Sequence, residues 1–301
     1  MMKRILIDTD LGIDCDDAIA LAMLINLEKR KECEIASVTI SSSRKGAAAA
    51  ARAMFDWYGA ACPPIGKYLG PPLPADAKNI YASALAEKYK KSDRAEAAVA
   101  VLRRALAETR GRCTLAAIGP LCNLAALLSS TPDDVSPLSG VELVREKAEE
   151  IFVMGGCFNG MLDGEFNIEQ DFFSVRLFTE TCPVKRIFVP FEAAYDILTG
   201  RDVSAETENP VALSVRLLFE REFPDTRPED RRRSSWDPVT ALLAVRGAKN
   251  YCQIVGPGEA RFSKTGAGEF FLTPTGKDYC IKGCVKELLQ REIDALCVRK
   301  E

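Results

Sequence analysis

Apolar residues in the first part of the chain follow two different spacings. Short apolar runs at 4–10 and 34–41 predict strands, and apolar residues at helical spacing over 16–30 predict a helix between them. An Ala-rich helix is predicted over 45–59, because Gly59 is a typical residue at a helix end. Strands that alternate with helices in this way indicate a parallel sheet with crossover helices on its faces.

The alternation continues to about residue 195. The expected elements are a helix over 92–111, a strand, turn and helix over 113–130, a strand over 149–156, a helix over 171–182 and a strand over 185–193. Residues 61–83 are Pro-rich and predicted to form a long loop, as are residues 157–171; short strands and turns follow over 251–283, then a helix over 285–298. No linker or repeat divides the chain. We therefore expect one α/β domain over 1–301, with a doubly wound, mostly parallel sheet flanked by helices and an insertion after its parallel part.

Composition narrows the classes of function. The chain has 301 residues and 47% hydrophobic content, enough for a sizeable core. Forty Lys and Arg against 43 Asp and Glu give a net charge of -3, which disfavours a nucleic-acid partner. No apolar run reaches the roughly 20 residues that cross a membrane, and the start of the chain does not resemble a signal peptide. A cytoplasmic protein without a membrane partner is expected.

The chain contains no histidine, which excludes every mechanism that depends on imidazole. Chemistry must then use carboxylates, hydroxyls, thiols, Lys, Tyr, backbone groups or a metal. The 11 cysteines are scattered and are expected to be reduced, mostly buried thiols.

An acidic loop between the first strand and the first helix carries the strongest chemical signal. Its five carboxylates lie within ten residues: Asp8, Asp10, Asp14, Asp16 and Asp17. In an α/β sheet this loop lies where ligands bind, and carboxylates so close together repel one another unless a cation compensates. Oxygen ligands favour Ca²⁺ or Mg²⁺. The alternative is that Asp14, Asp16 and Asp17 only cap the helix that follows.

Four segments resemble one known family in the same order. They are IDTDLGIDCDDAIAL, AAIGPLCNLAALL, FVMGGCFNGMLDGEFNIEQD and SSWDPVTALL, between about residue 3 and at least residue 245. The first is similar to the N-terminal fingerprint of the inosine-uridine-preferring nucleoside hydrolases, Ca²⁺ enzymes that cleave N-ribosidic bonds. The resemblance implies a Rossmann-like fold, a nucleoside substrate and a homodimer or homotetramer.

By matching position, the resemblance also implies a metal set and a base. Asp10 would contact Ca²⁺ and act as general base on the attacking, metal-bound water. Asp17 and Asp237 would supply two further carboxylates, and Cys122 a backbone carbonyl. Such a metal would orient water and ribose hydroxyls together.

The same resemblance implies a set of sugar contacts. Asn159, Glu165 and Asn167 match residues that hold the ribose hydroxyls, and Asp16 would be a further acceptor. Met154 and Phe166 are expected either to line the pocket or to serve only in apolar packing.

Three departures from the family pattern affect these roles. The acidic loop is about two residues longer than in the best-known members, so the division of roles among Asp14, Asp16 and Asp17 stays open. Ser43 stands where the family has an Asn that contacts the sugar. Trp236 stands where many members have a His that protonates the leaving base. Purine-preferring members also have Trp there, so Trp236 either stacks on a purine base or packs in the core.

The main functional hypothesis is Ca²⁺-dependent hydrolysis of ribonucleosides, with purine nucleosides slightly preferred. One alternative keeps the chemistry but changes the substrate to an unusual N-riboside, such as nicotinamide riboside. Another is a nucleoside or ribose sensor without turnover, against which the presence of Asp10 argues. The charged segment 227–235, RPEDRRRSS, is expected to be a solvated surface turn rather than an anion site.

Overall fold

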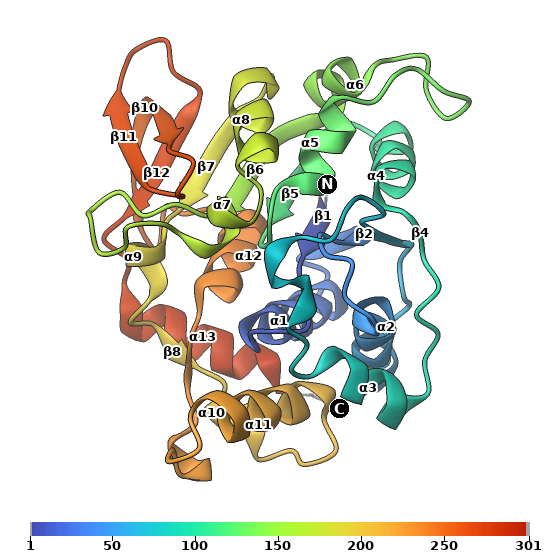
Figure 1. Ribbon diagram of the computed structural model, residues 1–301, viewed down its shortest axis with the longest axis vertical. Coiled ribbons are helices and arrows are strands. Elements are labelled where there is room, and N and C mark those ends of the chain that lie inside the picture. Colours follow the sequence, from blue (N-terminus) through green and yellow to red (C-terminus); the bar gives the residue numbers. More distant parts are fainter. Residues whose placement is uncertain (1, 299–301) are drawn as a thin grey trace.

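A ten-stranded sheet crosses the middle of the protein in this computed structural model, which describes residues 2–298 (Figure 1). The strand order is β11-β10-β12-β7-β6-β5-β1-β2-β3-β4. The strands are β1 (Lys3–Thr9), β2 (Cys33–Ile40), β3 (Ile65–Lys67), β4 (Glu96–Ala97), β5 (Cys113–Ala117), β6 (Ala148–Met154), β7 (Lys185–Val189), β10 (Gln253–Phe262), β11 (Gly268–Leu272) and β12 (Asp278–Lys282).

The order of the strands creates a switch point in the sheet. From β1 the chain builds outward through β2, β3 and β4, and it then returns to β5 on the other side of β1 and builds through β6 and β7. All of these strands and β12 pair in parallel, and only β10 and β11 are antiparallel. The expected doubly wound, mostly parallel α/β sheet is confirmed. Ligand sites in such sheets lie beyond the carboxyl ends of the strands at the switch point, here between β1 and β5.

Helices cover both faces of the sheet. They are α1 (Asp16–Lys29), α2 (Ala47–Trp57), α3 (Ala82–Tyr89), α4 (Ala98–Ala107), α5 (Cys122–Leu128), α6 (Gly140–Lys147), α7 (Phe166–Gln170), α8 (Phe172–Thr181), α9 (Phe191–Ala194), α10 (Arg201–Ser204), α11 (Pro210–Glu222), α12 (Trp236–Arg246) and α13 (Lys286–Cys297), with 3-10 turns at Pro74–Ala77 and Pro228–Asp230.

Alternation along β1 explains the two-sided core. Ile5 and Ile7 point into a core that contains α1, α2, α11, α12 and α13, whereas Leu6 points into a second core with α4, α5, α6 and α8. Helices α1 and α12 are deeply enclosed, because every residue from Asp16 to Leu27 in α1 and from Asp237 to Val245 in α12 is buried. The sheet and these helices hold the residues at the carboxyl ends of the strands in fixed positions.

The structure also corrects several expected boundaries. The helix expected over 92–111 begins only at Ala98, because the preceding segment crosses the start of α2, where the Asp93 carboxylate accepts hydrogen bonds from Gly46 N and Ala48 N (2.9 and 3.0 Å). The expected loop over 61–83 contains β3 and a 3-10 turn and runs into α3. The short strands near the C-terminus join the main sheet, because β12 pairs with β7.

The cysteines and the lengths of the helices bear on two further expectations. The 11 cysteines are all free, and most of them are buried. Within residues 2–298 no helix combines the length and apolar character that crossing a membrane requires.

Candidate active site

A cavity of about 370 Å³ opens at the switch point of the sheet. This volume lies in the range of small-molecule sites. The loop after β1, the segment 154–169 and the start of α12 line it. Most of the residues expected at the site from sequence line the cavity: Asp10, Asp14, Asp16, Asp17, Met154, Glu165, Phe166, Asn167, Trp236 and Asp237.

Three buried carboxylates lie together in the lining of this cavity. One oxygen from each of Asp16, Asp17 and Asp237 lies within 4.8 Å of the others. Asp16 and Asp17 begin α1, and Asp237 belongs to the first turn of α12. Burial, and then repulsion by neighbouring carboxylates, raises the pKa of all three well above the usual value. For Asp237 the neighbours that raise the pKa include both Asp16 and Asp17.

The chemistry of this cluster fits a bound cation. Like charges that are buried this close together are costly unless a positive charge lies among them or the groups take up protons. The donor set consists of oxygens, with neither a thiolate nor an imidazole, which suits Ca²⁺ or Mg²⁺ better than zinc. The Thr9 hydroxyl donates a hydrogen bond to Asp17, and Asp237 N donates one to Asp16 (3.2 Å), so the carboxylates are held in place. The cluster could therefore hold a metal ion.

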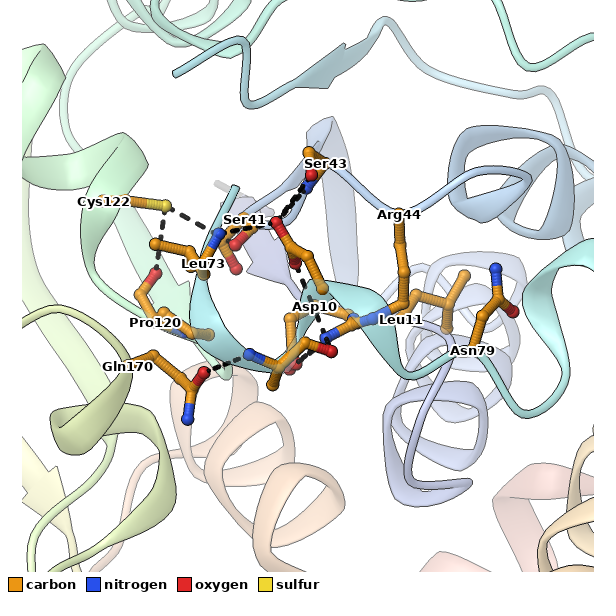
Figure 2. Close-up of polar contacts among 12 residues, drawn as sticks. Asp10, Leu11, Ser41, Ser43, Arg44, Leu73, Asn79, Pro120, Cys122 and Gln170 are labelled. Atoms are coloured by element: carbon orange, nitrogen blue, oxygen red, sulfur yellow. Dashed lines mark hydrogen bonds and ion pairs between the residues drawn. The ribbon is translucent and has the colours of Figure 1, made fainter. Parts of the chain in front are cut away.

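Asp10 lies beside this cluster but has a cationic partner of its own. The Arg44 guanidinium donates a hydrogen bond to the Asp10 carbonyl, and its Nη1 lies 3.4 Å from Asp10 Oδ2 (Figure 2). Arg44 is buried and also faces Asp76 at 3.7 Å. Burial raises the pKa of Asp10, and the charge of Arg44 opposes that rise. Arg44 thus fixes the orientation of the Asp10 carboxylate.

Asp14 pairs with a different arginine, Arg233, which was expected to lie in a solvated turn. Arg233 Nε lies 2.9 Å from both carboxylate oxygens of Asp14, and Nη2 lies 2.5 Å from Oδ2. Arg233 lines the cavity, and only 24% of its side chain is exposed. The interpretation of this residue as part of a solvated turn is therefore wrong. The neighbouring Arg232 is exposed, as expected of the turn.

Glu165 and Asn167 are fixed by the start of α7, a short helix where a loop was expected. Glu165 is its N-cap and accepts hydrogen bonds from Gly156 N (3.0 Å), Asn167 N (3.1 Å) and Ile168 N (3.3 Å). Burial raises the pKa of Glu165 to about 7, although these backbone donors oppose the rise. The Asn167 amide donates to the Met154 carbonyl at 3.3 Å.

Aromatic rings form one wall of the cavity. The Trp236 indole stacks on Phe191 with ring centroids 5.1 Å apart, and its Nε1 donates a hydrogen bond to the Phe191 carbonyl (3.1 Å). The Arg233 guanidinium lies over the same indole, 5.0 Å from its centroid. Phe166 is 44% exposed and also lines the cavity. The Trp236 ring is thus fixed in orientation at the cavity wall.

Three residues expected at the site are not among those that line the cavity. The Ser43 hydroxyl donates a hydrogen bond to Asp76 (2.7 Å; Figure 2), and Ser43 does not line the cavity. The Cys122 thiol points to the Ser41 carbonyl (3.5 Å), and Cys122 does not line the cavity, while the role expected of its backbone carbonyl stays a prediction. Asn159 is exposed, and its side-chain oxygen accepts a hydrogen bond from Met161 N (3.0 Å) within its own loop.

The sequence did not predict the contacts of the two arginines or the partners that hold Asp8. Asp8, whose pKa burial raises to about 7, accepts hydrogen bonds from Asn123 (2.8 Å) and Thr39. Asn123 belongs to α5, the helix after β5, and Thr39 belongs to β2, so these hydrogen bonds link β1 to α5 and to β2. Arg44 follows the strand predicted over 34–41, and a polar residue at the carboxyl end of a parallel strand is a candidate for the ligand site.

Fold and cavity together define an α/β protein with an acidic ligand site at the switch point of its sheet. The family model for inosine-uridine preferring nucleoside hydrolases matches residues 5–273. The chain therefore belongs to this family, whose members are hydrolases of N-glycosyl compounds. A comparison with curated protein sequences finds no match.

Solved structures with this fold include several nucleoside hydrolases. The inosine-uridine preferring nucleoside hydrolase from Bacillus anthracis has a TM-score of 0.74 at 18% identity, over 99% of this chain and 100% of that one. The purine-preferring ribonucleoside hydrolase from Gardnerella vaginalis has a TM-score of 0.75 at 17% identity, over 98% and 99%. The effector protein XopQ, solved with adenosine diphosphate ribose, has a TM-score of 0.72 at 17% identity, over 99% and 94%. At these identities the likeness shows the fold.

Proposed function

We propose that this enzyme hydrolyses the N-glycosidic bond of ribonucleosides with Ca²⁺ at the cluster of Asp16, Asp17 and Asp237. The observation that carries the proposal is this buried cluster, which lines a cavity of about 370 Å³ together with Asp10. When bound, Ca²⁺ would supply a fixed positive charge for oxygen ligands and for the activation of water. This set adds Asp16 to the expected Asp17 and Asp237, and the expected contacts of Asp10 and of the Cys122 carbonyl with the ion remain part of the proposal.

Asp10 would serve as the general base. Its carboxylate would accept a proton from water while the water oxygen bonds to C1′ of the ribose, and the electron pair of the C1′–N bond would leave with the base. The contact with Arg44 supports this role, because a base must be held in one orientation to receive the proton. Glu165 and Asn167 would hold the ribose hydroxyls, since both are buried and line the cavity.

A slight preference for purine nucleosides is part of the same proposal. Trp236 offers an aromatic surface at the cavity wall, and Phe191 fixes its orientation. Stacking of aromatic groups contributes about 0.5–1.5 kcal/mol beyond the burial of area, so a larger purine ring should gain more than a pyrimidine. The Gardnerella vaginalis structure, named as purine-preferring, has the same fold.

The experiment that tests the proposal is a release assay over a panel of ribosides. Inosine, adenosine, guanosine, uridine, cytidine and nicotinamide riboside would each be incubated with the protein after chelation and after addition of Ca²⁺ or Mg²⁺. We expect release of free base and ribose that chelation abolishes and Ca²⁺ restores, fastest with a purine nucleoside. Fast turnover of nicotinamide riboside alone would favour the unusual-riboside alternative, and binding of a nucleoside without release would favour a sensor.

We further propose that residues 1–301 act as one domain and that the chain forms a homodimer or homotetramer, as the family resemblance implies. Sedimentation analysis of the purified protein measures the second point directly. A monomer at the concentrations used in the assay would contradict it.

A further inference from the structure

We propose that Arg233 is a catalytic residue that stabilises the leaving base by its positive charge. The inference rests on the proposed function, since it concerns the second half of the same reaction. A chain without histidine has no imidazole to protonate the departing base. Arg233 is a fixed cation in the wall of the cavity, next to the ring on which that base would stack.

The backbone of Arg233 is fixed by a two-stranded ribbon outside the main sheet. Strand β9 (Arg233–Ser234) pairs with β8 (Leu198–Thr199), and Arg233 lies opposite Thr199. The hydroxyls of Thr199 and Ser235 lie 2.6 Å apart, which joins the ribbon to the start of α12. The side chain therefore enters the cavity from a rigid element, as a preorganised charge requires.

The Arg233 guanidinium is also held in place, but one of its nitrogens has no hydrogen-bond acceptor. Asp14 engages Nε and Nη2, while the rings of Trp236 and Phe223 lie 5.0 and 5.5 Å from the guanidinium carbon. Among residues 2–298, no side chain or carbonyl accepts a hydrogen bond from Nη1. The charge lies over the Trp236 indole with a free donor, so a base at that ring would meet both.

The reaction creates negative charge at this position. As the C1′–N bond breaks, its electron pair stays on the nitrogen of the base, while water supplies the oxygen that bonds to C1′ and gives a proton to Asp10. Arg233 keeps its proton, because a guanidinium is effectively always charged, and the base anion takes its proton from solvent. Arg233 would thus lower the energy of the departing anion through charge and hydrogen bonding.

The competing explanation is that Arg233 only holds Asp14 in place. The two roles predict different dependence on the leaving group. A cation that stabilises the base matters most when that base is a poor leaving group, as a purine or pyrimidine is. A residue that only positions Asp14 would affect all ribosides alike, because they share the sugar.

The test compares the best natural nucleoside of the panel with p-nitrophenyl β-D-ribofuranoside, whose p-nitrophenolate leaves without help. We expect Arg233→Gln to lower kcat for the nucleoside by about 10²-fold while changing kcat for the p-nitrophenyl riboside by less than about threefold. Arg233→Lys keeps the charge and can still pair with Asp14, so its kcat for the nucleoside should lie between those of the wild type and Arg233→Gln. Arg232→Gln removes the same charge from the adjacent exposed position and is the matched control. Thermal unfolding of each variant checks that it is folded.

The outcomes separate this inference from the proposed function. Equal losses on both substrates in Arg233→Gln and Arg233→Lys, with an active wild type, would overturn the inference and leave the proposed function intact. Unchanged turnover of the nucleoside in Arg233→Gln would do the same. A wild-type protein that hydrolyses neither substrate in Ca²⁺ would overturn both.

Discussion

Removal of one carboxylate from the cluster of Asp16, Asp17 and Asp237 should change stability in opposite directions without and with calcium. The oxygens of the three residues lie within 4.8 Å of one another. At an effective dielectric constant of about 20, two full charges at that distance repel by about 3.5 kcal/mol. Uptake of protons relieves part of this cost, so Asp237→Asn should stabilise the metal-free protein by about 1–3 kcal/mol near pH 8.

The pH dependence of this effect follows from the direction of the pKa shifts. Burial and repulsion raise the pKa of the three carboxylates in the folded state, so folding favours their protonated forms. Their contribution to stability is therefore fully present below the unfolded pKa of about 3.9 and is lost as pH rises toward the folded pKa. The metal-free wild type should lose stability between pH 5 and pH 8, and Asp237→Asn should lose less.

Calcium should make the wild type more stable than Asp237→Asn. A ligand at about 100 times its Kd stabilises a folded protein by about 2.7 kcal/mol, or about 5 °C in Tm for a chain of this size. The wild type should gain this increment in Ca²⁺, whereas Asp237→Asn should gain little, because it lacks one of the three carboxylates.

The assay is thermal unfolding of both proteins in chelator and in Ca²⁺, at pH 5 and pH 8. Asp225→Asn, at an exposed position outside the cavity, is the control for loss of one negative charge. If Asp237→Asn is less stable than the wild type in chelator at pH 8 and gains as much as the wild type in Ca²⁺, the three carboxylates neither repel one another in the folded protein nor bind the ion together.

The remaining predictions concern single side chains. Asp10→Asn should lower kcat by at least about 10²-fold while Ca²⁺ still binds, and near-normal turnover would exclude Asp10 as the base. Trp236→Ala should lose activity on inosine more than on uridine, and Trp236→Phe should restore most of it, whereas equal losses with lower Tm would mean that Trp236 only packs. Arg103 is buried and donates hydrogen bonds to Asp133 (2.8 Å) and to the Ser136 and Leu138 carbonyls, so Arg103→Gln should destabilise by about 2–4 kcal/mol in chemical denaturation. Hydrogen bonding to Arg103 lowers the pKa of Asp133 to about 2, so its stabilising contribution, present above the unfolded pKa of about 3.9, should fade as pH falls toward 2, and Asp133→Asn should abolish that dependence.

The sheet and the acidic loop could be predicted because their signals are local. Apolar runs at strand and helix spacing define β1, α1 and β2, and the five aspartates lie within ten residues, from the end of β1 to the start of α1. The position of that loop then follows from a general property of parallel sheets. Asp237 could be assigned only through the family resemblance, because it lies far beyond the loop in sequence.

The arginine partners could not be predicted in the same way. Arg233 and Asp14 are 219 positions apart, and nothing in the spacing around either residue shows that they meet. Arg44 and Asp10 are 34 positions apart, and their contact depends on how the chain turns after β2. Ser43 faces Asp76 for a related reason, since the 3-10 turn that contains Asp76 lies inside the expected irregular loop.

The burial of α12 has a consequence for when the core can fold during synthesis. This helix packs against α1, β1, β5 and β6, yet it begins only at residue 236 of 301. A nascent chain that has not yet released α12 from the ribosome leaves a gap over its central strands and also lacks Asp237. Core closure and assembly of the carboxylate cluster therefore belong to one late step of folding, and a chain truncated before α12 should have neither.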